Sequence, residues 1–168
     1  MSKMDDAALN SIKVLALDMI DKAGSGHPGI VLGAAPILYA LYKEQMDVIP
    51  SNPNWINRDR FVMSAGHGSA LLYSVLYHMG YGIDMEELKH FRDLSSLTPG
   101  HPEVKVTPGV DASTGPLGQG VGMAVGSFLH VEVVPLIGGV VAPGLHAGQE
   151  CVGGLGCAAG GTVDHGHE

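Results

Sequence analysis

Residues 61–73, FVMSAGHGSALLY, join a short apolar run to a glycine turn and then to a second apolar run. The first four of these residues are typical of a short buried strand, which the AGHG turn at residues 65–68 ends. Residues 69–79, SALLYSVLYHM, favour a helix directly after the turn. A strand, a glycine turn and a helix in succession indicate an α/β layer architecture.

Helical patterns flank this unit on both sides. Before it, apolar residues recur at the spacing of one helical face, at Leu9, Ile12, Ala16, Met19, Ile20 and Ala23. Gly24 follows where this helix should end. Pro36 is expected in the first turn of a second helix, because that turn does not use the N–H group that proline lacks. Beyond the unit, residues 84–94 favour a short amphipathic helix, residues 95–114 a long loop, and residues 115–126 the glycine-rich start of another helix.

The composition describes one globular domain and excludes several classes of protein. The 168 residues are 45% hydrophobic and carry a net charge of -8, without the clustered Lys and Arg that a nucleic-acid partner requires. Residues 1–10 hold two acids and no apolar core, so they do not form a secretory signal. The most apolar run, residues 128–145, is interrupted by His130, Glu132 and two prolines and does not predict a membrane span. Two cysteines make no disulfide framework, and we expect a cytoplasmic protein.

Three histidines lie in loops beside glycine or proline: His27 in SGHPG, His67 in SAGHGS and His101 in TPGHPE. Glycine beside histidine suggests that another group comes close to the backbone there. The helix expected after His67 offers free N–H groups and a positive dipole end, so His67 is a candidate ligand for a phosphate. The alternative is that the glycines only shape a tight turn, and that histidines in such loops are solvated surface residues.

Other histidines and the cysteines suggest different interpretations. His78 and His90 fall within helical patterns, where a structural role is favoured. The three loop histidines lack the short spacing of a usual zinc-ligand pair. An alternative function is metal binding by four side chains in the last part of the chain, those of Cys151, Cys157, His165 and His167. Their spacing lies outside the usual zinc-finger patterns, so this function remains an alternative.

Four motifs occur in one order: SGHPG at residues 25–29, NRDRFVMSAGHGSALLY at 57–73, LKHFRDLSSLTPGHPE at 88–103 and STGPLGQG at 113–120. From about residue 6 to Gly126 the sequence resembles the start of transketolases. This resemblance implies an incomplete parallel-sheet thiamine diphosphate-binding fold with helices packed on the sheet. It also implies transfer of a two-carbon ketol (glycolaldehyde) unit from a ketose phosphate to an aldose phosphate, as in the pentose phosphate pathway. Thiamine diphosphate, Mg²⁺ and a homodimer with the cofactor between two subunits belong to the same expectation.

The resemblance assigns roles to six residues. His27 and His101 resemble the family histidines that bind the sugar substrate and assist proton transfer, and they are the expected catalytic and substrate-binding residues. His67 resembles the histidine that binds the cofactor diphosphate. The segment formed by Gly115, Pro116 and Leu117 resembles the one that lies against the cofactor.

The sequence departs from the family after Gly126. All Lys and Arg residues precede Ser127, and the Gly-Asp-Gly motif and following asparagine that hold the magnesium in the family are absent from this sequence. We therefore expect two parts: residues 1–126, the amino-terminal half of a thiamine diphosphate-binding domain, and residues 127–168, an atypical glycine-rich tail of unrelated sequence. A reading-frame shift near Ser127 is the simplest account, and a genuine glycine-rich linker is the alternative. The chain is then an inactive fragment or, alternatively, a non-catalytic subunit or binding module of a split transketolase.

Overall fold

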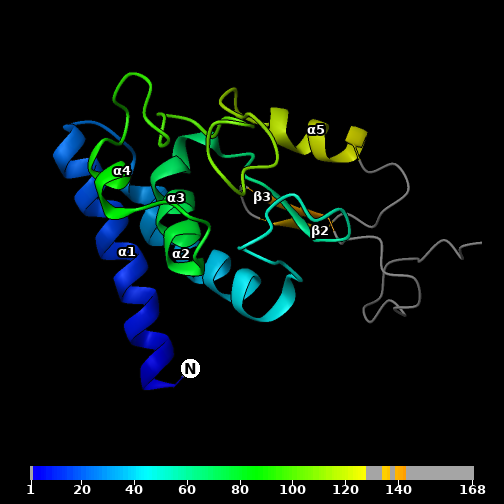
Figure 1. The fold of residues 1–168 in the computed structure, drawn as a ribbon, viewed down its shortest axis with the longest axis horizontal. Helices are drawn as coiled ribbons and strands as arrows, with labels where there is room; N and C mark the ends of the chain where they lie inside the picture. Colours follow the sequence, from blue (N-terminus) through cyan, green and yellow to red (C-terminus); the bar gives the residue numbers. More distant parts are fainter. Residues whose placement is uncertain (1, 128–133, 137–138, 143–168) are drawn as a thin grey trace, which may run out of the picture.

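A computed structural model describes residues 2–127, 134–136 and 139–142. Figure 1 shows a helical body to which a small sheet and a last helix are added at one side. In chain order the elements are α1 Lys3–Ala23, α2 Pro28–Ala40, the π-helical turn Leu41–Gln45, β1 Arg60–Val62, the 3₁₀ turn Gly66–Gly68, α3 Ser69–Met79, α4 Met85–Lys89, α5 Gln119–Ser127, β2 Val134–Leu136 and β3 Gly139–Ala142.

Helix α1 begins and ends where the sequence predicts. Ser2 and Asp5 form a reciprocal capping box at its start, which satisfies backbone N–H groups that have no partner within the helix. Gly24 ends the helix in the left-handed conformation, with φ 62°. The predicted face packs on α2 and α3, and the buried core of this layer includes Leu9, Ile12, Ala16, Met19, Val31, Leu38, Leu71, Leu72 and Leu76.

Helix α2 starts earlier than the sequence predicts. Pro28 occupies its first turn, directly after His27, whereas Pro36 lies in the helix interior. The placement of Pro36 in a first turn was therefore wrong. Both prolines satisfy the backbone angle of a helix, but only the residue at the start loses no hydrogen bond. The Pro28 ring supplies that start one residue beyond the candidate histidine.

The strand, turn and helix predicted from residues 61–79 are present. The strand covers Arg60–Val62 and α3 covers Ser69–Met79, and Gly80 ends α3 with φ 83°. Helix α4 is shorter than the predicted 84–94, since it ends at Lys89. Arg92 has a φ of 70°, which is incompatible with a continuing right-handed helix.

The α/β class is confirmed, but the strands pair differently from the prediction. The sheet order is β1-β3-β2 and both pairs are antiparallel, with Phe61 opposite Val141 and Pro135 opposite Val140. Only residues 137 and 138 separate β2 from β3, and parallel neighbours would need a crossover connection of a dozen or more residues. The parallel sheet is therefore not seen among the described strands.

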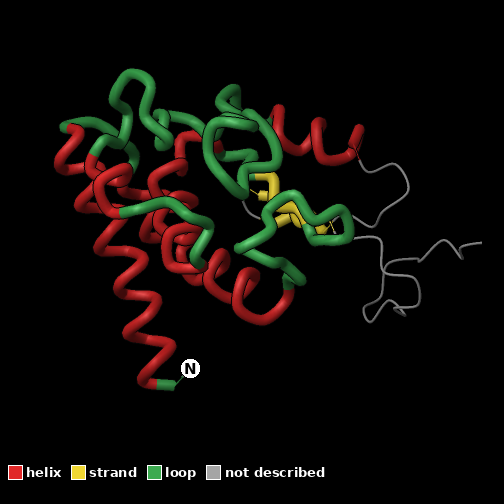
Figure 2. Tube along the Cα trace, in the orientation of Figure 1, coloured by secondary structure: helices red, strands yellow, loops and turns green. Residues whose placement is uncertain are grey.

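Loops join the helical body to the last helix. Figure 2 shows green loop segments between the helices and α5, and further loops beside α4. Helix α5 contacts β1 and β3. Gly120 lets this helix approach the chain just after β1, because a Cβ there would lie 2.5 Å from Cα of Ser64. Residues 128–133, 137–138 and 143–168 lie outside the described structure, and most of the predicted tail falls among them. Within the described helices, none combines the length and the apolar character needed to cross a membrane.

Candidate functional site

His27 and His67 lie side by side at the starts of two helices. His27 is the N-cap residue of α2, and His67 lies in the 3₁₀ turn that leads into α3. Their ring centroids are 5.0 Å apart and the rings meet edge to face at 71°. Neither helix start receives a side-chain cap. Two helix N-termini with free N–H groups and two imidazoles therefore face the same region, which is an arrangement suited to an anion.

His101 joins this pair from the long loop. A Cβ built on Gly115 would lie 3.6 Å from both Cγ and Cδ2 of His101, so the histidine ring lies against the Gly115 backbone. The charge of His101 also acts on His67, which places the third histidine within electrostatic range of the second. The fold thus brings together three histidines that are separated by 40 and 34 residues, since they lie at positions 27, 67 and 101.

The glycines beside the histidines permit close approach of other parts of the protein. A Cβ on Gly66 would lie 2.8 Å from the carbonyl carbon of Thr114 and 2.9 Å from the nitrogen of Gly115. A Cβ on Gly26 would lie 2.7 Å from the side chain of Ile20. The close approach of another group to the backbone, which the sequence predicts, therefore exists at these glycines. The approaching group belongs to the same chain. Gly66 lets the His67 turn touch the Gly115 segment directly.

The three histidines differ in their surroundings. His27 and His101 are exposed, whereas His67 is partly buried between them. Burial lowers the pKa of His67 below its ordinary value, and the positive charges of His27 and His101 lower it further. The free chain therefore favours a neutral imidazole at His67. An anion bound beside the ring would favour the protonated form and reverse this effect.

The Gly115 segment continues into α5. Pro116 and Leu117 are exposed, and 76% of the Leu117 surface is accessible. The carbonyl of Pro116 accepts a hydrogen bond from the Gln119 N–H at 3.2 Å, and Gly118 turns the chain with φ 84°. The apolar Leu117 side chain, two residues after Gly115, is therefore exposed at the surface.

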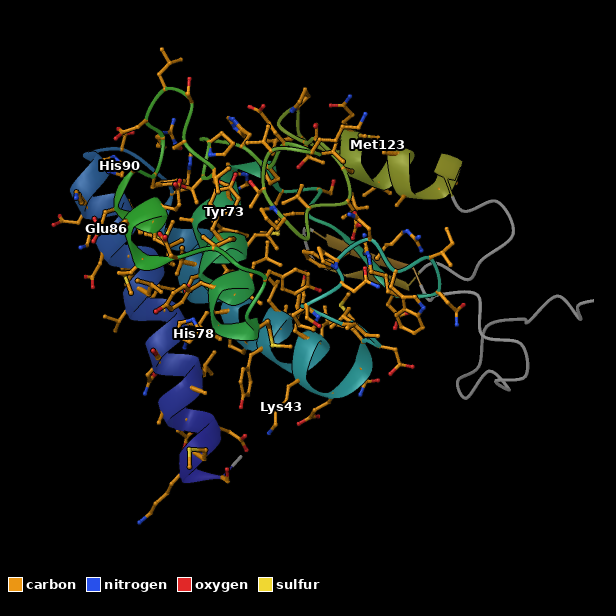
Figure 3. The ribbon with its side chains drawn as sticks, in the orientation of Figure 1. Lys43, Tyr73, His78, Glu86, His90 and Met123 are labelled. Atoms are coloured by element: carbon orange, nitrogen blue, oxygen red, sulfur yellow. The ribbon has the colours of Figure 1, made fainter. Side chains whose placement is uncertain are left out.

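His78 and His90 stand apart from the cluster. The His78 ring is hydrogen-bonded to the Ser11 hydroxyl at 2.9 Å and to the Ser74 carbonyl at 2.7 Å, so it joins α1 to α3. His90 pairs with Asp93 at the surface. Figure 3 shows both histidines away from α5 and Met123. Their contacts fit the structural role expected from the helical pattern.

A buried hydroxyl fixes the junction between the cluster and the strand. The Thr114 hydroxyl donates to the Met63 carbonyl at 2.7 Å, and the Thr114 N–H donates to the Pro102 carbonyl at 3.1 Å. This bridging role was not predicted. The available signal was the polar Thr114 directly before Gly115, in a loop that has to satisfy its backbone groups without a regular strand partner.

A resident metal has no visible site among the described residues. Within 2–127, 134–136 and 139–142, no group of three or more His, Cys, Asp or Glu side chains is arranged to hold a metal ion. The alternative metal site of Cys151, Cys157, His165 and His167 lies outside the described residues.

Thiamine diphosphate fits the histidine cluster at its diphosphate end. The two uncapped helix starts and the partly buried His67 offer donors to an anion. The Gly115 backbone lies against the His101 ring and the His67 turn, where it can contact the organic part of the group.

Comparison with known proteins identifies the family. Residues 4–133 match the thiamine diphosphate-binding domain of transketolase. The transketolase of Geobacillus stearothermophilus is 58% identical over 123 residues, covering 73% of this chain and 18% of that enzyme. The chloroplastic transketolase-1 of Arabidopsis thaliana is 54% identical over 129 residues, covering 76% of this chain and 17% of that enzyme.

Comparison with solved structures gives the same family. A transketolase of Pichia stipitis in complex with sedoheptulose 7-phosphate has a TM-score of 0.72 at 51% identity, over 74% of this chain and 18% of that one. The transketolase of Campylobacter jejuni has a TM-score of 0.71 at 52% identity, over 75% of this chain and 20% of that one. The chain spans about a fifth of the length of these relatives and, by sequence and by fold, belongs to the transketolase family.

Proposed function

We propose that this chain supplies the diphosphate-binding side of a thiamine diphosphate site that serves two-carbon ketol transfer between sugar phosphates. The observation that carries the proposal is the pair of His27 and His67 rings, 5.0 Å apart, at two helix N-termini without side-chain caps. Anions bind such helix starts readily, because the N–H groups and the helix dipoles both favour negative charge. His101 and Gly115 extend this surface toward the organic part of the cofactor.

Each residue of the site has a distinct role in this proposal. His67 binds the diphosphate, and its imidazole takes up a proton as the anion approaches. His27 and His101 are exposed, so they can bind the hydroxyls of a sugar phosphate and move protons on and off its oxygens. Gly115, Pro116 and Leu117 lie against the cofactor. When bound, thiamine diphosphate supplies the ring that stabilises the carbanion.

The remaining parts of the function are also proposals. Mg²⁺ belongs to the family expectation, but the Gly-Asp-Gly motif and asparagine that hold it in the family are absent from this sequence, so no role is assigned to it. A second subunit would cover the histidine cluster, as the family resemblance implies for a homodimer. A role in the pentose phosphate pathway stays a prediction of the same resemblance. The cytoplasmic location and the division at residue 126 stay predictions from the sequence. The chain alone is expected to carry out no ketol transfer.

Calorimetric titration of the purified 168-residue chain tests the cofactor role. Thiamine diphosphate should bind, and thiamine without the diphosphate should bind at least about tenfold more weakly, because hydrogen bonds to charged groups are the stronger contacts. His67→Gln should remove most of this difference, whereas the control His78→Gln should leave it unchanged. Equal binding of thiamine and thiamine diphosphate, or an unchanged His67→Gln variant, would contradict the proposal.

A transfer assay tests the catalytic part separately. With a ketose phosphate donor and an aldose phosphate acceptor, the chain should show no turnover above a His67→Gln control. Loss of one positioned acid or base costs about 10²- to 10⁴-fold in rate, and the Gly-Asp-Gly motif and asparagine that hold the magnesium in the family are also absent from this sequence. Measurable transfer by a preparation free of full-length transketolase would show that the chain is a complete enzyme. The alternative of a split transketolase subunit uses the same histidines and predicts that turnover appears when a partner chain is added.

A further inference from the structure

Two hydroxyl side chains of α3 hold the backbone of the His101 loop. The Ser69 hydroxyl donates to the Gly100 carbonyl at 2.8 Å. The Tyr73 hydroxyl lies 2.8 Å from the Pro99 carbonyl and 3.1 Å from the carbonyl of His101 itself. Ser69 and Tyr73 are four residues apart, so they lie on the same face of the helix. This face therefore carries a pair of donors directed at one loop segment.

Both donors are buried, which makes their hydrogen bonds hard to replace by water. Ser69 and Tyr73 have 0% of their surface exposed. Burial also raises the pKa of the Tyr73 phenol, so the hydroxyl stays protonated and remains a donor. Figure 3 shows Tyr73 within the body of the molecule, in contrast to His78 on the same helix and His90 beyond α4. A buried carbonyl that loses such a donor is left unsatisfied.

The carbonyls of residues 98–102 all accept hydrogen bonds. Backbone N–H groups serve the two ends: Arg92 donates to Thr98, and Thr114 donates to Pro102. Of the three carbonyls between them, that of Gly100 accepts from Ser69, and those of Pro99 and His101 share the single hydroxyl proton of Tyr73. The central part of the loop, which carries His101, thus depends on side-chain hydroxyls, because it belongs to no described helix or strand.

The turn that leads into helix α3 also carries His67. His67 lies in the turn directly before the helix, and Ser69 is the first helical residue. One rigid element therefore sets the position of His67 and, through two hydroxyls, that of the His101 backbone. The His101 ring rests on Gly115, and the Gly66 backbone contacts Gly115 from the His67 turn. A change in the hydroxyl pair would move His101 relative to both.

We propose that Ser69 and Tyr73 are positioning residues that hold His101 against Gly115 and at a fixed place relative to His67. The proposal rests on the proposed function only for the use of His101 by a substrate. The geometric part concerns the free chain. Tyr73→Phe and Ser69→Ala each delete a donor and leave the rest of α3 in place.

Nuclear magnetic resonance of the full chain, with ¹³C-labelled histidine rings, tests the positioning directly. In the wild-type chain, the His101 ring protons should show Overhauser contacts to the Gly115 Hα protons. Tyr73→Phe and Ser69→Ala should each weaken these contacts at least twofold and shift the His101 ring signals. The His78 ring signals should stay fixed and report that α1 and α3 remain packed. Tyr39→Phe is the matched control, since it deletes a hydroxyl of α2 that donates to Asp5 at 2.9 Å and not to the loop.

The outcomes separate the two proposals. Unchanged His101 signals in both variants would overturn the positioning role. If His78 moves together with His101 in both variants, the hydroxyls hold the whole fold and the positioning role also fails. If one variant unfolds, the other decides by the same two signals. Thiamine diphosphate binding is then measured on the same samples: a wild-type chain that does not bind it while His101 responds as expected would refute the proposed function and leave the positioning role intact.

Discussion

The helical layer of α1, α2 and α3 and the loop segment of residues 98–118 are held together by different forces. Apolar side chains fill the space between the three helices, whose backbone groups are paired within each helix. The loop segment has few regular backbone partners, and its carbonyls accept from the Ser69 and Tyr73 hydroxyls, whereas the Thr114 hydroxyl donates from the loop to the Met63 carbonyl. The candidate site lies where these two regions meet. The position of this loop therefore depends on its polar contacts to the helical layer and to Met63.

The largest loss of stability is expected when the ion pair between Arg58 and Asp111 is broken. Arg58 pairs with Asp111 at 2.5 Å, with side chains only 11% and 7% exposed, and Asp111 also accepts from the Phe61 N–H at 2.8 Å. Asp111→Asn should lower the free energy of unfolding by about 3 kcal/mol, because it leaves the buried guanidinium without its counter-charge. Denaturant unfolding monitored by circular dichroism measures this.

The control for Asp111 is a hydrogen-bonded pair at the surface. His90 and Asp93 are 59% and 62% exposed, so Asp93→Asn should change the free energy of unfolding by less than about 0.5 kcal/mol. Equal effects of Asp111→Asn and Asp93→Asn would show that the loop region does not depend on buried polar contacts.

A smaller effect is expected where the two regions touch through glycine. A methyl group at Gly66 would lie within 2.9 Å of backbone atoms of Thr114 and Gly115, which have no rotamer with which to move away. Gly66→Ala should therefore cost about 2 kcal/mol and displace the His67 turn from Gly115. Gly122→Ala in α5 meets no atom within 4 Å and should be neutral or slightly stabilising. Thermal melts of the two variants that coincide would contradict the close contact.

The sequence predicted the helical layer well because its determinants are local. The spacing of Leu9, Ile12 and Ala16 and the stop at Gly24 identify α1, and residues 69–79 identify α3 from end to end. Pro36 was misplaced because a proline pattern does not tell which of two prolines begins a helix. The loop histidines were recognised as candidates, and the fold brings His27 and His67 together.

The determinants of the remaining structure are not local. The hydroxyl bonds of Ser69, Tyr73 and Thr114 cross 26 to 51 residues of sequence, and no periodicity reports such pairs. The antiparallel strands β2 and β3 lie in the segment that was assigned to an atypical tail. The valines of Val134–Leu136 and Gly139–Ala142 and the intervening Gly138 are a hairpin signal, but each strand is too short to give a sustained period of 2.

The smallest stability effect concerns one hydroxyl. Thr114→Val keeps the shape of the side chain but removes the donor to the Met63 carbonyl. The free energy of unfolding should fall by about 1 kcal/mol, because a buried carbonyl loses its partner. Hydrogen exchange of the Thr114 N–H, which donates to Pro102, should accelerate in this variant. An unchanged unfolding midpoint together with unchanged exchange would show that this junction is held by other contacts.

The titration of the His67 ring in the presence of a diphosphate tests the central claim most directly. Burial first, and then the charges of His27 and His101, hold the pKa of His67 below its ordinary value in the free chain. Because an anion favours the charged imidazole, binding of thiamine diphosphate should raise this pKa, and affinity should increase as the pH falls through it. The midpoint of the His67 proton signals should be higher with thiamine diphosphate than with thiamine, while the His78 ring signals at one pH should be the same with both compounds. Equal midpoints for His67 with both compounds would contradict the role of His67 in diphosphate binding.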